Sequence, residues 1–277
     1  MKVHCSNEYD PLKVVVLAPP EFMAIKVPIN DIQKKHAKKN IDRQLAEKQH
    51  QTFVEKLQEH GVQTILLPPE EKYHEQVFTR DIGFTLGNQI FVAEMARDVR
   101  RGEERILIDY LKEQEITYTD IKGNIIEGGD VIIDGKTIYV GISQRTNKFA
   151  IRHLQTLLPS YDVIPVPFTD TYLHLDCVFN VLSPTEGLIF PGEFHKEKER
   201  MLRDRYDLIH VSAKEQATLG TNVLSIGNKK VISLPINEGV NKELQKRGYE
   251  VIEVDFSEII KSGGSFRCCS MPLLREQ

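Results

Sequence analysis

The sequence lacks a long hydrophobic run and a strong excess of charge of either sign. It has 277 residues with 36 Lys and Arg against 40 Asp and Glu, a net charge of −4. No segment approaches the roughly 18 apolar residues of a membrane-spanning helix, and the N-terminal residues lack the apolar region of a signal peptide. The one basic run, 34–39, leads into a helical pattern and is typical of a solvated face rather than a nucleic-acid contact. These absences predict a cytoplasmic protein with no nucleic-acid and no membrane partner.

Cysteine is also scarce. The four cysteines show no disulfide or zinc spacing: Cys5, Cys177, Cys268 and Cys269. Because Cys268 and Cys269 are adjacent, a disulfide between them would be strained. A metal site from His174, Asp176 and the cysteines is an alternative, but the spacing matches no zinc pattern. We therefore expect no metal and no cofactor.

What the sequence does contain is a repeat. Three apolar segments that begin at 161, 206 and 249 have nearly the same pattern, Tyr-Asp/Glu-Val/Leu-Ile-x-Val. Two further segments rich in apolar and β-branched residues complete a set of five strand candidates: 62–67 and 116–119. Each strand candidate follows a segment with helical spacing: 43–60, 103–113, 148–158, 197–204 and 241–247. Hairpin patterns precede four of these helices: 82–94, 131–141, 178–191 and 222–235.

The repeating unit is thus a hairpin, a helix and a strand. Leu12 to Leu17 is a lone strand candidate, and Met271 to Leu274 can pair with it, so that the two terminal segments share one unit. Such a unit cannot bury its apolar face alone, and closing the units in a ring removes exposed sheet edges. The prediction is an α/β fold of five units in a ring, forming one domain over residues 1–277.

The loops between these units carry the residues with reactive chemistry. Asp81, Glu127, His174 and Cys268 each lie between the last strand of a unit and the next hairpin. Because equivalent loops of a ring converge on its axis, we expect these side chains to meet in one pocket. The remaining loop, 218–222, has no ionisable group.

The segment from Gly263 to Pro272 contains the candidate nucleophile, Cys268 or Cys269. The adjacent Arg267 favours a thiolate, which is the reactive form of cysteine. Burial is the competing interpretation, because cysteine is among the most buried residues. Residue chemistry alone does not choose between the two cysteines.

The other candidates are individually weaker. His174 lies in an apolar alternation typical of a structural histidine, although Asp176 would share its face in an extended strand. Glu127-Gly128-Gly129-Asp130 can be a simple turn, or it can orient a base or hold a cation. The arginines at 100, 101 and 145 can bind a carboxylate or lie at solvated helix starts. One thiol, one imidazole and several carboxylates together suggest covalent catalysis on a cationic substrate.

Taken together, these residues resemble the guanidino-group-modifying superfamily, which includes arginine deiminases, dimethylarginine dimethylaminohydrolases and glycine amidinotransferases. The matching pieces occur in the family's order: Thr79-Arg80-Asp81, Glu127-Gly128-Gly129-Asp130, Gly141 to Asn147, His174-Leu175-Asp176, and Gly263-Gly264 with Arg267-Cys268. The resemblance implies a five-bladed α/β propeller (pentein) with pseudo-fivefold repeats around a central active site.

The resemblance also implies a role for each candidate. Cys268 matches the nucleophile, His174 the general acid and base, and Glu127 the carboxylate that orients the histidine. Four residues match substrate contacts: Asp81 and Asp176 at the guanidinium, and Arg100 and Arg145 at the amino-acid carboxylate. The mechanism implied is a Cys-His reaction without metal or cofactor, on a small-molecule guanidino substrate.

The implied activity is hydrolysis of C–N bonds other than peptide bonds in a linear amidine. A covalent thiouronium would form and break down to citrulline plus ammonia or an amine, if the substrate is arginine or a methylated arginine. Chain length and Arg145-Thr146-Asn147 favour the dimethylargininase type. That type usually has Glu at the position of Arg80. The presence of Arg80 here, together with Asp176, favours an unmethylated substrate.

Further alternatives stay open at this point. An amidinotransferase would replace water by an acceptor amine, and a non-catalytic propeller would resemble the ribosome anti-association factor of this fold. The segment 19–29, which begins with two prolines, is a candidate lid over the pocket. The oligomeric state is also open, with a homodimer as one alternative.

Overall fold

The structure is a computed structural model that describes residues 1–121 and 123–276. Over these residues the chain forms five sheets of three strands each. In four of them an antiparallel hairpin is followed, after a helix, by a strand parallel to the second hairpin strand. These sheets are β3 (Gly83–Leu86), β4 (Gln89–Val92) and β5 (Tyr118–Asp120); β6 (Val131–Asp134), β7 (Thr137–Ile142) and β8 (Asp162–Pro167); β9 (Phe179–Val181), β10 (Glu186–Ile189) and β11 (Asp207–His210); and β12 (Leu224–Gly227), β13 (Lys230–Ser233) and β14 (Glu250–Glu253). The predicted repeating unit is confirmed.

The remaining sheet joins the two terminal segments of the chain. Strand β1 (Leu12–Leu17) pairs antiparallel with β15 (Met271–Arg275) and parallel with β2 (Gln63–Leu66). Val16 lies opposite Met271 in this register. The predicted pairing of these two segments is therefore confirmed, and it gives both strands a partner along an edge that would otherwise be exposed.

Each predicted helix lies between the two parallel strands of one sheet. They are α2 (Arg43–Glu59), α3 (Glu103–Glu113), α4 (Lys148–Leu157), α5 (Lys196–Arg205) and α7 (Glu238–Lys246). Side-chain caps fix two of their starts, because Asp42 accepts a hydrogen bond from the N–H of Leu45 and Asn147 accepts one from Ala150.

The sequence patterns missed the shortest helices, which span too few turns for an apolar stripe to be recognised. These are α1 (Asp31–His36), α6 (Ala213–Gln216) and three 3₁₀ turns, η1 (Gly128–Asp130), η2 (Leu175–Cys177) and η3 (Ile259–Ser262). The basic run 34–39 overlaps α1, and its four lysines are exposed. Its neighbour Gln33 is fully buried, so α1 exposes one face to solvent and buries another.

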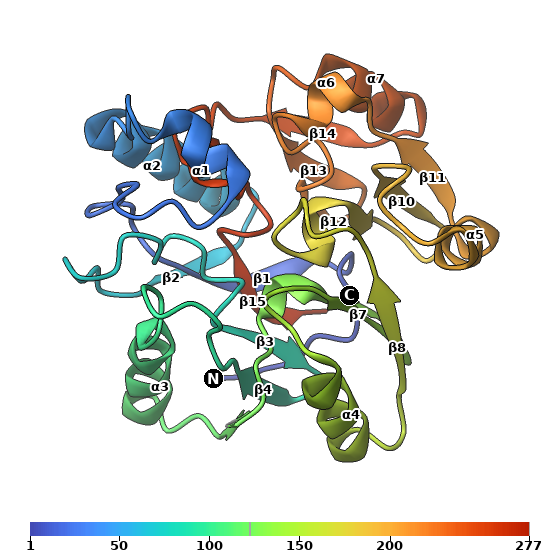
Figure 1. The fold of residues 1–277 in the computed structure, drawn as a ribbon, viewed down its shortest axis with the longest axis horizontal. Helices are drawn as coiled ribbons and strands as arrows, with labels where there is room; N and C mark the ends of the chain where they lie inside the picture. The colour runs from blue at the N-terminus through green and yellow to red at the C-terminus, as the bar shows by residue number, and fades with distance from the viewer. Residues whose placement is uncertain (122, 277) are drawn as a thin grey trace.

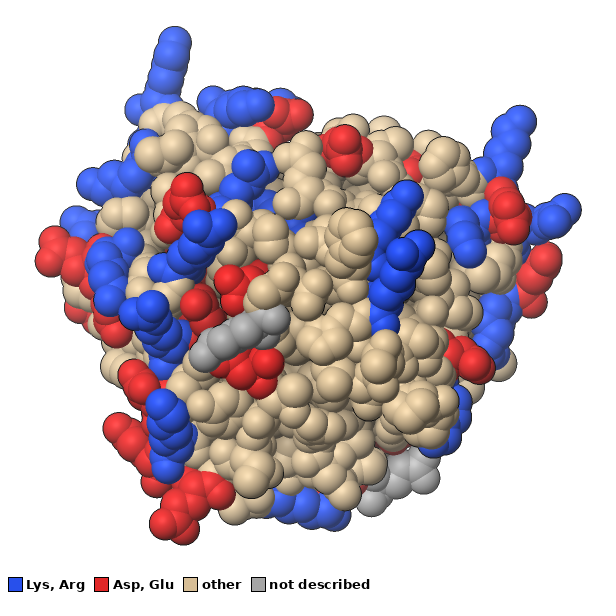
Figure 2. Space-filling model, turned by 60° about the horizontal axis from the view of Figure 1, so that its bottom comes forward, with Lys and Arg blue, Asp and Glu red and all other residues tan. Residues whose placement is uncertain are grey.

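Figure 1 shows the five sheets set around the middle of the molecule, with the longer helices toward the outside. Acidic and basic side chains are interspersed over the face shown in Figure 2 rather than gathered by sign. Within the described residues, no helix combines the length and the apolar character needed to cross a membrane.

Candidate active site

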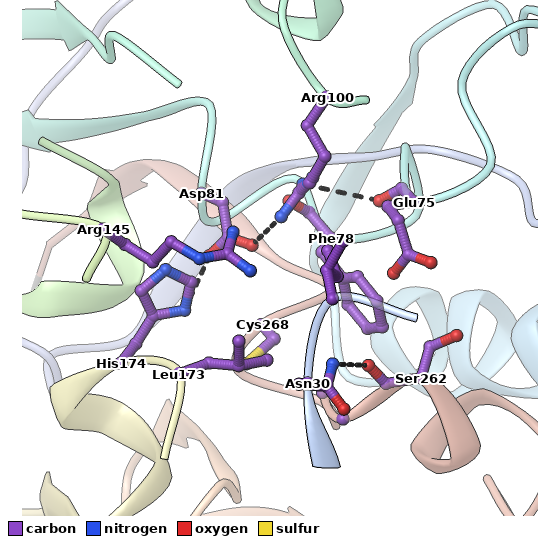
Figure 3. A pocket seen from close by; sticks show the side chains of 13 residues that line it. Asn30, Glu75, Phe78, Asp81, Arg100, Arg145, Leu173, His174, Ser262 and Cys268 are labelled. Carbon is purple, nitrogen blue, oxygen red and sulfur yellow. Dashed lines mark hydrogen bonds and ion pairs between the residues drawn. The ribbon is translucent and has the colours of Figure 1, made fainter. Parts of the chain in front are cut away.

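A cavity lies where the loops between the sheets meet, and Figure 3 shows the side chains around it. Five of the seven predicted site residues line it: Asp81, Arg100, Arg145, His174 and Cys268. The other two, Glu127 and Asp176, contact His174 and Cys268. The expected convergence of loops that are distant in sequence is thus present in the structure.

His174 is held as a cation among carboxylates. Its Nε2 lies 2.7 Å from Oε2 of Glu127, and its Nδ1 lies 3.5 Å from Oδ1 of Asp81. Burial opposes the charged imidazole, but Asp81, the hydrogen bond to Glu127 and nearby Asp130 outweigh it and raise the pKa of His174 to about 10. His174 therefore carries a proton that it can donate at neutral pH.

Glu127 is correspondingly held as an anion. Burial alone would raise its pKa, but the hydrogen bond and charge of His174, together with Arg145, lower it to about 2. Its second oxygen, Oε1, accepts a hydrogen bond from the backbone N–H of Ala96 at 3.0 Å. The orienting role that the resemblance implies for Glu127 fits this geometry.

The glycines of the Glu-Gly-Gly-Asp segment allow this close packing. A Cβ on Gly129 would lie 2.7 Å from the His174 ring and 2.8 Å from Oδ1 of Asp81. A Cβ on Gly128 would lie 2.2 Å from the carbonyl oxygen of Arg80. The segment is thus a close approach of backbone to the site, which only glycine permits, as well as a turn.

Asp130, at the end of this segment, positions backbone. Its Oδ1 accepts the N–H of Leu175 at 2.9 Å, and its Oδ2 accepts the hydroxyl of Ser143 at 2.6 Å. These bonds tie the loop that carries His174 to the hairpin of β6 and β7. Asp130 is fully buried and therefore fixes the backbone of the loop that carries His174.

The thiol of Cys268 faces a carboxylate. Its Sγ lies 3.7 Å from Oδ2 and 3.8 Å from Oδ1 of Asp176. A hydrogen bond with the Cys177 thiol, burial and the negative charge of Asp176 raise the pKa of Cys268 well above its ordinary value. The cysteine is therefore a neutral thiol in this arrangement.

The expectation of a Cys268 thiolate is therefore wrong, because the attraction between Arg267 and the thiolate is outweighed. The Arg267 guanidinium donates to Oδ2 of Asp176 at 2.6 Å and to Oε1 of Glu8 at 3.0 Å. Its charge is thus shared between two buried carboxylates. These two carboxylates offset the charge that sequence reasoning assigned to the thiol alone.

Backbone contacts fix the position of Cys268. Its N–H donates to Oδ1 of Asn222 at 3.1 Å, and its carbonyl oxygen accepts the N–H of Arg80 at 3.0 Å. Phe266, two residues earlier, stacks on Phe256 with ring centroids 4.4 Å apart. Asn222 comes from the loop that has no ionisable residue, and sequence reasoning missed it because an amide offers no titration signal.

Asp81 and Arg100, both predicted to contact substrate, contact each other. Nη1 of Arg100 lies 2.5 Å from Oδ2 of Asp81, and Nη2 lies 2.8 Å from Oε2 of Glu103 (Figure 3 labels Asp81 and Arg100). All three side chains are buried. The Asp81 carboxylate is therefore already bound to one guanidinium, which belongs to the protein.

Arg145, in contrast, has unused donors. Its Nη1 lies 3.4 Å from Oε2 of Glu127, while its buried Nε and Nη2 atoms have no hydrogen-bond partner among the described residues. A buried guanidinium with two unpaired nitrogens is ready for a planar, bidentate acceptor such as a carboxylate.

Glu75 is a cavity-lining residue that sequence reasoning missed. Its Oε1 accepts a hydrogen bond from Nε2 of Gln33 at 2.8 Å. Burial raises the pKa of Glu75 to about 8, although the charge of Arg100 opposes the shift. An isolated Glu six residues before Asp81 belongs to no recognisable motif, so only the structure reveals it.

The cavity is small, and a larger hollow adjoins it. The cavity has about 10 Å³ of free space, roughly what one water needs. The hollow of about 540 Å³ shares Ile29, Asn30, Arg145 and Leu173 with it. Ile29 ends the predicted lid segment 19–29, and Asn30 is anchored through its Nδ2 to the carbonyl oxygen of Ser262 at 2.9 Å.

Two groups among the described residues place metal-ligating atoms close together. In the first, Asp81, Glu127 and His174 are already engaged by Arg100 and by one another. The second consists of Asp176, Cys177 and Cys268.

Comparison with known proteins finds relatives that match most of this chain. The family described as N,N dimethylarginine dimethylhydrolase, eukaryotic, matches residues 19–275. The uncharacterized protein YkgA of Bacillus subtilis (strain 168) is 52% identical over 274 residues, which cover 99% of this chain and 96% of YkgA. An arginine deiminase of Listeria monocytogenes serotype 4b (strain CLIP80459) is 28% identical over 249 residues, which cover 72% of this chain and 61% of the deiminase.

A solved structure extends the likeness to the fold. The N-terminal domain of ArgZ, an arginine dihydrolase from cyanobacteria, superimposes with a TM-score of 0.88 at 21% identity and covers 96% of this chain and 98% of its own. The family match spans most of the chain and includes all seven predicted site residues. The protein therefore belongs to the guanidino-group-modifying superfamily, in the N,N dimethylarginine dimethylhydrolase family.

Proposed function

We propose that the protein is a cysteine hydrolase of guanidino groups, with L-arginine as its preferred type of substrate. One observation carries the proposal. The buried Cys268 thiol and the His174 cation line one cavity, and buried carboxylates already bound to guanidinium groups adjoin both of them. A guanidinium is a stable cation, and carboxylates can hold its N–H groups in a fixed orientation.

Binding would proceed by exchange at Asp81. A substrate guanidinium would take the place of the Arg100 guanidinium on Oδ2 of Asp81, while Arg100 keeps its contact with Glu103. Arg100 and Arg145 could then both reach the substrate carboxylate, and Glu75 could accept its ammonium group. The exchange would therefore favour substrates that carry a guanidinium and a carboxylate together.

The chemistry would follow from the charges of the site. The arriving cation offsets the carboxylates that keep Cys268 protonated, so the thiol passes its proton to water and the thiolate sulfur attacks the guanidinium carbon. His174 donates its proton to the departing ammonia and leaves a thiouronium on Cys268. Water then adds at the same carbon and gives one proton to His174. The carbon–sulfur bond breaks as the second proton of that water passes to sulfur, which restores the Cys268 thiol. The product of one turnover is a ureido acid, citrulline from arginine.

The two carboxylates also affect whether a methylated substrate can bind. Asp81 and Asp176 are both buried near the nucleophile, and a guanidinium nitrogen of the substrate can pair with them only through an N–H. A dimethylated nitrogen offers no N–H and would leave a buried carboxylate without a partner, which costs about 1–3 kcal/mol or more for a charged group. We therefore place arginine ahead of asymmetric dimethylarginine as a substrate.

We further propose that the five sheets are blades of a closed α/β propeller, with the paired β1 and β15 completing one blade in a single catalytic domain. The ring of sheets in Figure 1 and the likeness to the ArgZ domain support this arrangement.

The test is turnover of L-arginine and of asymmetric dimethylarginine, side by side, by the protein and by its Cys268→Ser variant. Ureido product from arginine alone supports the proposal, and activity that survives in Cys268→Ser contradicts the mechanism. Preferential turnover of the dimethylated compound would overturn the argument from the two carboxylates. The number of ammonia molecules released per arginine consumed distinguishes a single hydrolysis from a double hydrolysis, as in the name arginine dihydrolase given to ArgZ.

A further inference from the structure

Gln33 is a buried amide beside the cavity, and the proposed reaction assigns it no part. It lies on α1, and its side chain is fully buried although the lysines of that helix are exposed. Its Nε2 donates to Oε1 of Glu75 at 2.8 Å and to the carbonyl oxygen of Ser262 at 3.3 Å. Its Oε1 accepts the N–H of Ile29 at 2.8 Å. Both donors and the acceptor oxygen of this side chain are thus in use.

These contacts join three segments that are distant in sequence. Ile29 lies just before α1, Glu75 belongs to the loop between β2 and β3, and Ser262 ends η3. Asn30 strengthens the junction, because its Oδ1 accepts the N–H of Gln33 at 2.8 Å and its Nδ2 donates to the same carbonyl oxygen of Ser262. A buried polar network with its groups paired is rigid, so the amide of Gln33 is held in one orientation.

The contact with Gln33 leaves one oxygen of Glu75 for a ligand. Oε1 accepts the amide, whereas Oε2 has no hydrogen-bond donor among the described residues. The hydroxyl of Ser262 is buried and also lacks a partner among these residues. Figure 3 shows Glu75 and Ser262 on the side of the cavity away from His174. A cation with several N–H groups would satisfy both oxygens.

We propose that Gln33 is a positioning residue for recognition of the α-ammonium group of the substrate. By holding Oε1 of Glu75, the amide would direct Oε2 to the place where the ammonium group binds. The same N–H stabilises Glu75 as an anion, because a hydrogen bond to a charged acceptor is stronger than one between neutral groups. This inference rests on the proposed function and adds that α1 takes part in choosing the substrate.

The carboxyl of Glu75 has few other groups that favour its charged form. Burial raises its pKa to about 8, and Glu103 acts in the same direction. The charges of Arg100 and Arg145 and the hydrogen bond from Gln33 oppose the shift. The Gln33 amide therefore increases the fraction of Glu75 that is an anion near neutral pH and can pair with an ammonium group.

The first experiment compares two ligands that differ in one group. L-arginine and 5-guanidinopentanoate, which is arginine without its α-ammonium group, are titrated by calorimetry into the Cys268→Ser protein, with and without Gln33→Met. We expect Gln33→Met to weaken L-arginine binding about tenfold or more and to change 5-guanidinopentanoate binding less than about twofold. Equal weakening of both ligands, or undiminished binding of L-arginine, overturns the proposal.

Gln49→Met is the matched control. Gln49 is also a buried amide on a helix, and its Nε2 donates to a carboxylate oxygen, Oδ2 of Asp255, at 2.8 Å. Asp255 is not among the residues that line the cavity. We expect Gln49→Met to lose stability as Gln33→Met does, but to leave the affinity for both ligands unchanged. If it weakens L-arginine as much as Gln33→Met does, the effect belongs to stability and the proposal fails.

The second experiment needs no variant of Gln33. The side-chain amide signals of Gln33 and Gln49 are followed by nuclear magnetic resonance as the pH is raised, and again as L-arginine is added to the Cys268→Ser protein. We expect the Gln33 signal to move as Glu75 ionises, near pH 8, and to move again with L-arginine, whereas the Gln49 signal does neither. A Gln33 signal that follows neither the pH nor L-arginine overturns the proposal.

The two proposals fail in different ways. If L-arginine binds as described but the unaltered protein does not hydrolyse it, Gln33 keeps its positioning role and the proposed function is lost. If L-arginine is hydrolysed while Gln33→Met weakens both ligands equally, only the role of Gln33 is lost.

Discussion

Asp81 and Asp176 are two buried carboxylates with similar predicted roles, yet their arginine partners differ. Arg100, on Asp81, lines the cavity and has Glu103 as a second carboxylate partner. Arg267, on Asp176, also donates to Glu8 and to the carbonyl oxygen of Val131, both at 3.0 Å. Under the proposed function, the same pairing of acid and arginine therefore gives a contact that substrate would exchange at Asp81 and a fixed contact at Asp176.

The largest expected effect concerns the fixed arginine. Arg267→Met should lower the free energy of unfolding by about 3–5 kcal/mol, because it leaves the buried carboxylates of Glu8 and Asp176 without their shared cation. Chemical denaturation measures the change. Arg101→Met is the control, since Arg101 forms an exposed pair with Asp98 and should cost less than about 1 kcal/mol. Equal losses in the two variants would contradict the assignment of Arg267 as a fixed partner.

The exchangeable arginine should instead determine specificity. Arg100→Gln should lower kcat/KM for L-arginine about 100-fold, because a charge-assisted contact to the substrate carboxylate is lost. Agmatine lacks that carboxylate and should lose far less, so the ratio of the two kcat/KM values should fall. Arg101→Gln, at the neighbouring position, should leave the ratio unchanged. A parallel loss for both substrates in Arg100→Gln would show that Arg100 only supports the fold.

The proton on His174 should set the alkaline limit of the reaction. Its pKa is raised to about 10, so the donating form is present below that pH and is lost as the pH rises through it. Glu127→Gln removes a negative charge and should move this limit to lower pH by about one unit or more, equivalent to about 1.4 kcal/mol. Profiles of kcat against pH for the two proteins measure the shift. An unchanged limit in Glu127→Gln would assign it to another group.

The smallest effect is expected at Glu75. Burial raises its pKa to about 8, so the carboxyl is neutral below that pH and becomes an anion above it. KM for L-arginine should therefore fall between about pH 7 and pH 9, by less than about tenfold, as the anion becomes available to the substrate ammonium group. Glu75→Gln should remove this dependence. Agmatine serves as the control, since it has no α-ammonium group and its KM should not follow Glu75 in either protein.

The sequence was a good guide to the repeated units and a weaker one to the site. Turn residues such as Asp134-Gly135 and the apolar segments at 161, 206 and 249 are local signals, and the hairpins and parallel strands follow them. The convergence of Asp81, His174 and Cys268 also followed from their equivalent loops. Their roles rested on the resemblance, and they remain proposals.

The rest of the site depends on contacts between residues that are distant in sequence. Nothing near Arg100 in the chain indicates that its partner is Asp81, and nothing near Asn222 indicates that it accepts the Cys268 N–H. The state of the Cys268 thiol depends on Asp176 and Cys177, some ninety residues away. Burial and charge at such contacts are properties of the folded chain, and local patterns do not carry them.

The pairing of β1 with β15 has a consequence for how the protein acquires its site. Strand β15 begins three residues after Cys268, and its partner β1 lies at the opposite end of the described chain. Pairing strands so far apart in sequence requires the closure of a very long loop, which makes such contacts slow to form. Because Cys268 adjoins this strand, we expect its contacts with the carboxylates to form late in folding, together with the closure of this sheet.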